Sequence, residues 1–117
     1  MSHLKLVVNN LNRATEKDNF FFNKSELSII LNLYAKMVSK GFWKDYGLNI
    51  SKERVSFNVY KRASENAMFK ICKNYKRNDK GPKYFISDFQ GNILKSSKNL
   101  NELLKDTNWN NLRLVNE

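Results

Sequence analysis

A cluster of basic residues in the middle of the chain is the feature best suited to bind a ligand. Residues 52–83 contain ten Lys and Arg but only three Asp and Glu. Lys and Arg neutralise the phosphates of nucleic acids, and an aromatic ring on the same surface can stack on a base. The sequence therefore predicts a surface that binds RNA or DNA. Its candidate residues are Arg54, Tyr60, Lys61, Arg62, Lys70, Lys73, Lys76 and Arg77.

The positive charge has a second interpretation, in which it reflects the composition of the chain and has no binding function. The 117 residues carry a formal net charge of +10, and such a field attracts polyanions. However, the chain has 16 Lys, 5 Arg and 18 Asn, which is also the bias of an AT-rich genome. An antiparallel sheet commonly leaves one basic face to water. Both interpretations stay open at this stage.

Catalytic and metal-binding chemistry has few candidate residues. The chain contains one cysteine, Cys72, and one histidine, His3. A single thiol cannot form an internal disulfide, and one Cys with one His is too few for a zinc module. The four glycines are scattered, so no Gly-rich phosphate loop follows a strand and opens a helix. We expect a non-enzymatic protein with no catalytic residues, no metal and no cofactor.

A different class of function is suggested by aromatic residues near the middle of the chain. Exposed aromatic side chains concentrate at protein interfaces, although they can equally cap a core. The alternative prediction is a protein-interaction or regulatory module that binds a protein partner or forms a homo-oligomer. Its candidate interface residues are Trp43, Tyr46 and Glu65.

The first element expected to position these residues is a helix over residues 24–40. Asn23 and Glu26 have the spacing of a capping box, and Gly41 supplies a left-handed stop. Apolar residues recur at intervals of three and four between them and line one face. Ile29 and Leu33 lie partly off this stripe, which predicts that the helix is covered on more than one side.

After Gly41 the apolar period changes from 3.6 to 2, which predicts four or five antiparallel strands paired consecutively in a meander. Alternation would turn one set of residues toward the helix: Val55, Phe57, Val59, Phe69 and Ile71. The other face of the sheet would then carry Arg54, Asn58, Tyr60, Arg62, Lys70 and Asn74.

Near the end of the chain, Asn99 and Glu102 mark the start of a short second helix that ends near Asp106. The predicted fold is therefore α+β: a long N-terminal helix packed on a four- to five-stranded antiparallel sheet, with a short C-terminal helix. We expect residues 1–20 to form a loose arm and residues 21–117 a single domain. No apolar stretch is long enough to span a membrane, which favours a cytoplasmic protein.

Three short motifs, taken in order, resemble a known family. They lie at residues 22–27 (FNKSEL), 41–46 (GFWKDY) and 57–65 (FNVYKRASE). The chain resembles the small alphaproteobacterial family catalogued as domain of unknown function 2794, from about residue 22 to about residue 115. The resemblance implies a bacterial cytoplasmic protein with no assigned activity. It supplies no catalytic or binding residues.

Overall fold

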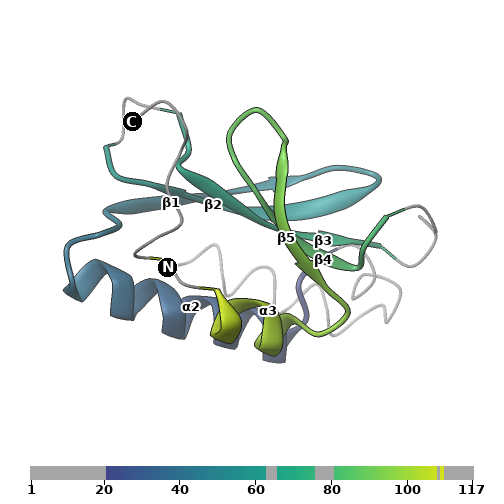
Figure 1. Ribbon diagram of the computed structural model, residues 1–117, viewed down its shortest axis with the longest axis horizontal. Helices are drawn as coiled ribbons and strands as arrows, with labels where there is room; N and C mark the ends of the chain where they lie inside the picture. The colour runs from purple at the N-terminus through teal and green to yellow at the C-terminus, as the bar shows by residue number, and fades with distance from the viewer. Residues whose placement is uncertain (1–20, 63–65, 76–80, 108, 110–117) are drawn as a thin grey trace.

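A five-stranded antiparallel sheet carries two helices on one of its faces (Figure 1). The computed structural model describes residues 21–62, 66–75, 81–107 and 109. This arrangement confirms the α+β class, with five strands in the meander. In chain order the elements are α2 (Lys24–Ser39), β1 (Asp45–Ile50), β2 (Arg54–Tyr60), β3 (Phe69–Asn74), β4 (Tyr84–Ser87), β5 (Ile93–Ser97) and α3 (Leu100–Asp106).

Helix α2 begins and ends where its local sequence predicts. The Asn23 side chain accepts a hydrogen bond from the backbone N–H of Glu26, and the Glu26 carboxylate accepts one from the backbone N–H of Asn23, both at 2.8 Å. At the other end Gly41 has a φ of +82°, and the N–H of Phe42 reaches back to the carbonyl of Met37 at 3.0 Å. This is a Schellman ending, which a residue with a Cβ would strain.

The strands pair consecutively in the order β1-β2-β3-β4-β5, and their register builds one apolar face. Phe57 lies opposite Ile71, which in turn lies opposite Ile86, and all three side chains are fully buried. Directly opposed residues share a face of the sheet, so this row lies on the side that packs against the helices. The inward set predicted from alternation is confirmed as buried: Val55, Phe57, Val59, Phe69 and Ile71.

Trp43 lies in the core, not on the surface expected of an interface residue. Its side chain is 3% exposed, and its ring packs edge-on against Trp109 with ring centroids 5.2 Å apart. The loop after α2 explains this, because the N–H groups of Phe42 and Trp43 both bond to the carbonyl of Met37 and turn the chain back under the helix. The burial of Trp43 agrees with the interpretation that the aromatic rings at the ends of the helix cap the core.

Tyr46 is also partly withdrawn from the surface. It is half-buried and stacks on Phe57, with ring centroids 4.8 Å apart and an interplanar angle of 6°. The rings of Tyr46 and Tyr34 of α2 form a T-shaped pair with centroids 5.0 Å apart. The third candidate of the predicted interface, Glu65, lies outside the described residues.

Helix α3 follows β5 and packs beside α2. The Asn99 side chain accepts from the backbone N–H of Glu102 at 3.0 Å, which confirms the predicted start of this helix. Three of its own side chains are buried in the core: Leu100, Leu103 and Leu104. Neither α2 nor α3, the helices within the described ranges, is both long and apolar enough to cross a membrane.

Candidate functional site

The face of the sheet that lies away from the helices carries several of the predicted binding residues. On β2, Arg54 and Tyr60 alternate with the buried Val55, Phe57 and Val59. Lys70 of β3 lies opposite Asn58 of β2 and is half-buried. Lys61 and Arg62 follow β2 directly and are exposed. Lys76 and Arg77 lie outside the described residues.

A hollow opens in the middle of this outer face, and we call it the outer hollow. It has a volume of about 280 Å³. Small side chains on neighbouring strands make room for it, because Ser56 lies opposite Cys72 and Ser87 lies opposite Lys70. Figure 1 shows the loop between β4 and β5 rising away from the helices, and Gly91 of this loop lines the hollow. The outer hollow is lined by Asn49, Ser51, Arg54, Ser56, Lys70, Cys72, Phe85, Ser87, Gly91 and Ile93.

Two cations line the outer hollow, and no carboxylate among the described residues does. The Nε of Arg54 donates to the Asn74 side chain at 2.8 Å, and the guanidinium lies 5.8 Å from the centroid of the Phe85 ring. Asn74 in turn donates to the carbonyl of Pro82 at 2.7 Å, so the arginine is held in one orientation. An oriented guanidinium and an ammonium group that line the same hollow are suited to binding a phosphate or a carboxylate.

Cys72 contributes a neutral wall to the outer hollow. Its side chain is 3% exposed, and burial raises the pKa of the thiol to about 11, although the Ser87 hydroxyl and the charges of Arg54 and Lys70 act in the opposite direction. The thiol is therefore protonated near neutral pH, whereas nucleophilic cysteines need the thiolate. This cysteine packs against the site and is unsuited to react there.

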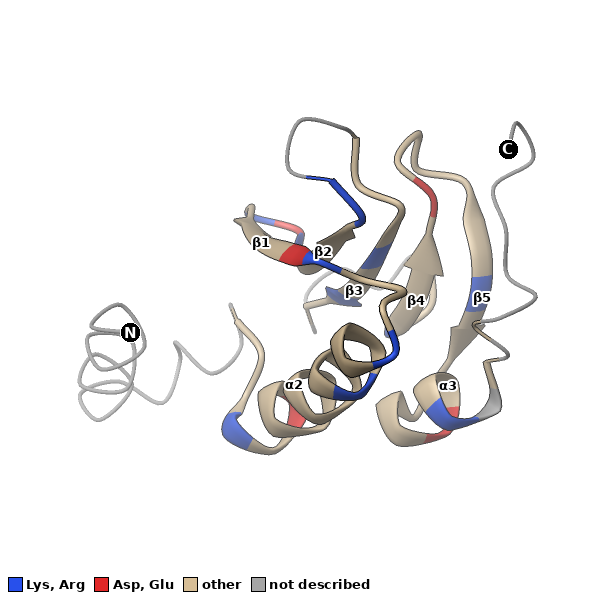
Figure 2. Ribbon diagram, turned by 90° about the vertical axis from the view of Figure 1, so that its left-hand side faces the viewer, with Lys and Arg blue, Asp and Glu red and all other residues tan. Residues whose placement is uncertain are grey.

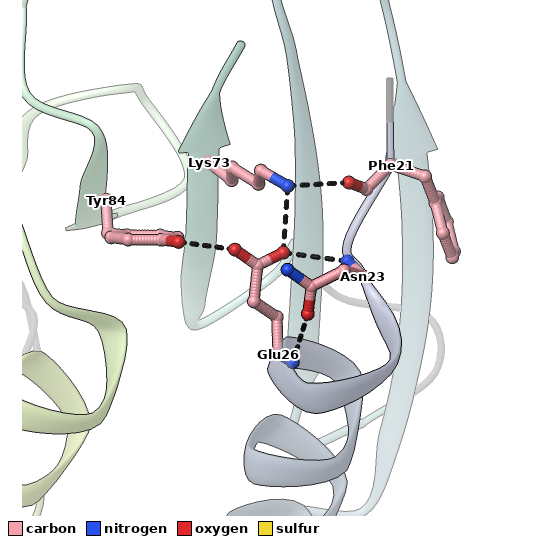
Figure 3. A network of polar contacts seen from close by, with 5 residues as sticks. All are labelled: Phe21, Asn23, Glu26, Lys73 and Tyr84. Carbon is pink, nitrogen blue, oxygen red and sulfur yellow. Dashed lines mark hydrogen bonds and ion pairs between the residues drawn. The ribbon is translucent and has the colours of Figure 1, made fainter. Parts of the chain in front are cut away.

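Lys73 is the predicted binding residue that the structure moves to the opposite face. It is 7% exposed, and its Nζ lies 2.8 Å from Oε1 of Glu26 and 2.9 Å from the carbonyl oxygen of Phe21 (Figure 3). Strand alternation explains this, because Lys73 has the same parity as the buried Phe69 and Ile71. Its expected place among the phosphate-binding residues is wrong.

Glu26 is the centre of a buried network that joins α2 to two strands (Figure 3). Its carboxylate accepts hydrogen bonds from Lys73 of β3, from the hydroxyl of Tyr84 of β4 and from the backbone N–H of Asn23. Burial alone would raise the pKa of Glu26, but these three donors and the charge of Lys73 hold it below its usual value. The pKa of Tyr84 is raised by burial and by the neighbouring carboxylate. The network is thus an ionised, hydrogen-bonded anchor for the start of α2.

Several residues that line the outer hollow were not predicted from the sequence. Ser56, Phe85 and Ser87 line it, and none of them stands out from composition or spacing. What they share is that strand alternation puts them on the same face of the sheet as Arg54 and Lys70. Their position beside these two residues follows only once the pairing register of the strands is known. Among the residues that the structure describes, no group of three or more His, Cys, Asp and Glu is placed to hold a metal ion.

Comparison with known proteins gives one result, at the level of the family. No similar protein was found among the curated proteins, and none among the solved structures. A family model described as Protein of unknown function (DUF2794) matches residues 20–104, which takes in every strand and most of α3. The match ends short of the residues near 115 to which the resemblance was expected to extend. The chain therefore belongs to the DUF2794 family of proteins of unknown function.

Proposed function

We propose that this protein binds single-stranded nucleic acid without catalysing a reaction, and that the outer face of the sheet is the binding surface. A phosphate of the strand would enter the outer hollow between Arg54 and Lys70. Tyr60, on the same face, would offer a ring to a neighbouring base. We include in this proposal the bacterial, cytoplasmic setting that the family resemblance implies.

The observation that carries the proposal is the charge of the outer hollow. Arg54 and Lys70 line it from two strands, and neither forms an ion pair with a carboxylate within the described part of the chain. An anion in the hollow would be attracted by both cations, and no described carboxylate in the lining would oppose it. A phosphate with its several acceptor oxygens matches both the arginine and the lysine.

The spacing of the other basic residues supports a ligand longer than one nucleotide. Lys61 and Arg62 directly follow β2, and Arg54 begins it. A strand rises about 3.3 Å per residue, so the two ends of β2 are about 20 Å apart. A flexible single strand can follow this curved face and contact basic residues at both ends, as strands do in other positively charged grooves.

The test is a titration of labelled oligonucleotides, of about 12 nucleotides, followed by fluorescence anisotropy at 50 and 200 mM salt. Single-stranded RNA, single-stranded DNA and the corresponding duplexes are compared. The variant Arg54→Gln/Lys70→Gln removes the two cations of the outer hollow. The matched control Lys36→Gln/Lys105→Gln removes the same charge from the helical side of the molecule.

We expect single strands to bind more tightly than duplexes. Each phosphate that is no longer neutralised should reduce the slope of log affinity against log salt by about 0.7 for single strands. Arg54 and Lys70 hold one phosphate in this proposal, so the outer-face variant should lose about 0.7 in slope. The control should keep the wild-type slope. An equal loss of slope in both variants would mean that the binding depends only on the net charge of the protein and would contradict a specific site. A preference for duplexes would contradict binding of single strands.

A further inference from the structure

A groove with an apolar floor lies between α2 and α3, on the opposite side of the molecule from the outer hollow. We call it the interhelical groove, and its volume is about 530 Å³. Ile29, Leu33 and Met37 follow one another along α2 at intervals of four residues, and Leu104 faces them from α3. Ile29 and Leu33 are half-buried, so α3 covers them only in part. These are the residues that the sequence placed partly off the main stripe of the helix.

The rim of the interhelical groove is positively charged. Lys36 and Lys40 come from α2 and its end, Lys105 comes from α3, and all three are exposed. No carboxylate among the described residues lines the groove, and the ion pair of the described chain joins two other residues, Lys73 and Glu26. A lysine in the last turn of a helix offsets the helix dipole, but three lysines around one hollow leave an excess of positive charge.

We propose that the interhelical groove binds an acidic amphipathic helix of a partner protein. Apolar side chains of the partner would cover Ile29, Leu33 and Leu104, and its carboxylates would meet the lysines of the rim. This is the groove mode in which many amphipathic helices are recognised. The inference is independent of nucleic-acid binding, because it concerns the other face of the molecule and different residues.

The shape and lining of the groove favour a helix over other anions. The apolar floor extends from Ile29 to Met37, which is about 12 Å of helix and matches apolar residues two turns apart on a partner. A nucleic acid would leave this floor without apolar contacts. A membrane surface needs apolar side chains that protrude, whereas these line a recess.

The positions of the lysines also fix the direction of the partner helix. Lys36 and Lys105 both lie in the last turn of their helices, and α2 and α3 lie side by side beneath the sheet (Figure 2). Figure 1 shows that α3 runs in the same direction as α2 but ends partway along it, so the end of the groove beyond α3 holds Lys36, Lys40 and the negative end of the α2 dipole. The N-terminus of a partner helix, with its positive dipole end and acidic first-turn residues, complements these lysines and this dipole. The partner should run antiparallel to α2.

The test is a selection on the full-length protein from a phage-displayed library of peptides of about 16 residues, which is long enough to form a helix. Charged and apolar positions are both randomised. We expect enrichment of peptides with Asp or Glu in the first turn, followed by apolar residues at i and i+4. An enriched peptide is then synthesised with a fluorescent label, and its affinity is measured by anisotropy.

Variants identify the surface that the peptide uses. Lys36→Gln/Lys105→Gln should weaken peptide binding at least about tenfold, and the charge-matched control Arg54→Gln/Lys70→Gln should leave it unchanged. Basic or uncharged enriched peptides, or equal affinity for both variants, would overturn the proposal. It would also be overturned if the wild type selected no peptide while Leu112→Ser/Leu114→Ser did, because the groove would then belong to residues 110–117 of the chain itself.

Discussion

Replacing Lys73 by methionine tests the buried anchor of α2 and the reasoning about its charge. Methionine keeps an unbranched side chain of similar reach but removes the ammonium group that bonds to Glu26 and to the carbonyl of Phe21. Removing one partner of a buried ion pair leaves the other charge uncompensated, which costs about 3–5 kcal/mol. The free energy of unfolding, measured by urea denaturation at pH 7, should fall by that amount.

The dependence of this loss on pH gives the sharper result. In the wild type the pKa of Glu26 is below its usual value, so the carboxylate adds stability above the unfolded pKa of about 4.3, and this is lost as the pH falls. In the Lys73→Met variant burial dominates and the pKa of Glu26 should rise. The free energy of unfolding of this variant should then be highest at low pH and should fall as the pH rises through the raised pKa of Glu26. The difference between the two proteins should therefore shrink between pH 7 and pH 4.

A second substitution, added to the first, tests whether Glu26 is the charge left uncompensated. Glu26→Gln/Lys73→Met removes both charges but keeps an amide that can bond to Asn23 and Tyr84. Since no buried charge is left, the double variant should be more stable at pH 7 than Lys73→Met alone, and its stability should depend little on pH. If the two variants have equal stability at pH 7 and the same pH profile, Glu26 is not the uncompensated charge and the assignment fails.

Substitutions at two further positions, Gly41 and Trp43, examine the fold. Gly41→Val should lower the free energy of unfolding by about 1–2 kcal/mol, because a φ of +82° is strained for a residue with a Cβ. No atom lies within 4 Å of the added Cβ, so a steric clash adds nothing to this cost. Gly41→Asn should cost less in the same thermal denaturation series, and an unchanged melting temperature for the valine variant would contradict the helix ending. Trp43→Ala should cost about 3–5 kcal/mol because the ring is buried against Trp109. A cost no larger than that of truncating an exposed aromatic residue would mean that Trp43 is not in the core.

The parts of the fold that could be predicted are those whose signals are local. The capping box of Asn23 and Glu26, and the stop at Gly41, involve residues within one turn of each helix end, so the sequence shows them directly. The inward set on β2 follows from a period of two along a single strand. Consecutive pairing of the strands was also the simplest topology, and it is the one observed.

The remaining features depend on which distant residues meet. The burial of Trp43 requires Trp109, 66 positions further along the chain, and no local pattern announces that contact. The outer hollow requires the register that sets Ser56 opposite Cys72 and Lys70 opposite Ser87. Lys73 is a different case, because its parity with Ile71 was already visible in the sequence.

Strand β3 connects the buried anchor to the proposed binding face. Its residues alternate, so that Lys73 pairs with Glu26 on the helical side while Lys70 and Cys72 line the outer hollow on the other. β3 therefore positions Lys70 in the outer hollow, and the ion pair of Lys73 and Glu26 attaches the same strand to α2. Because the anchor contributes no group to the outer hollow, its loss should weaken ligand binding only through unfolding. At temperatures where Lys73→Met remains folded, its affinity for single strands should equal that of the wild type. Arg54→Gln/Lys70→Gln should instead lose affinity while it is fully folded, although the lost hydrogen bond to Asn74 lowers its stability.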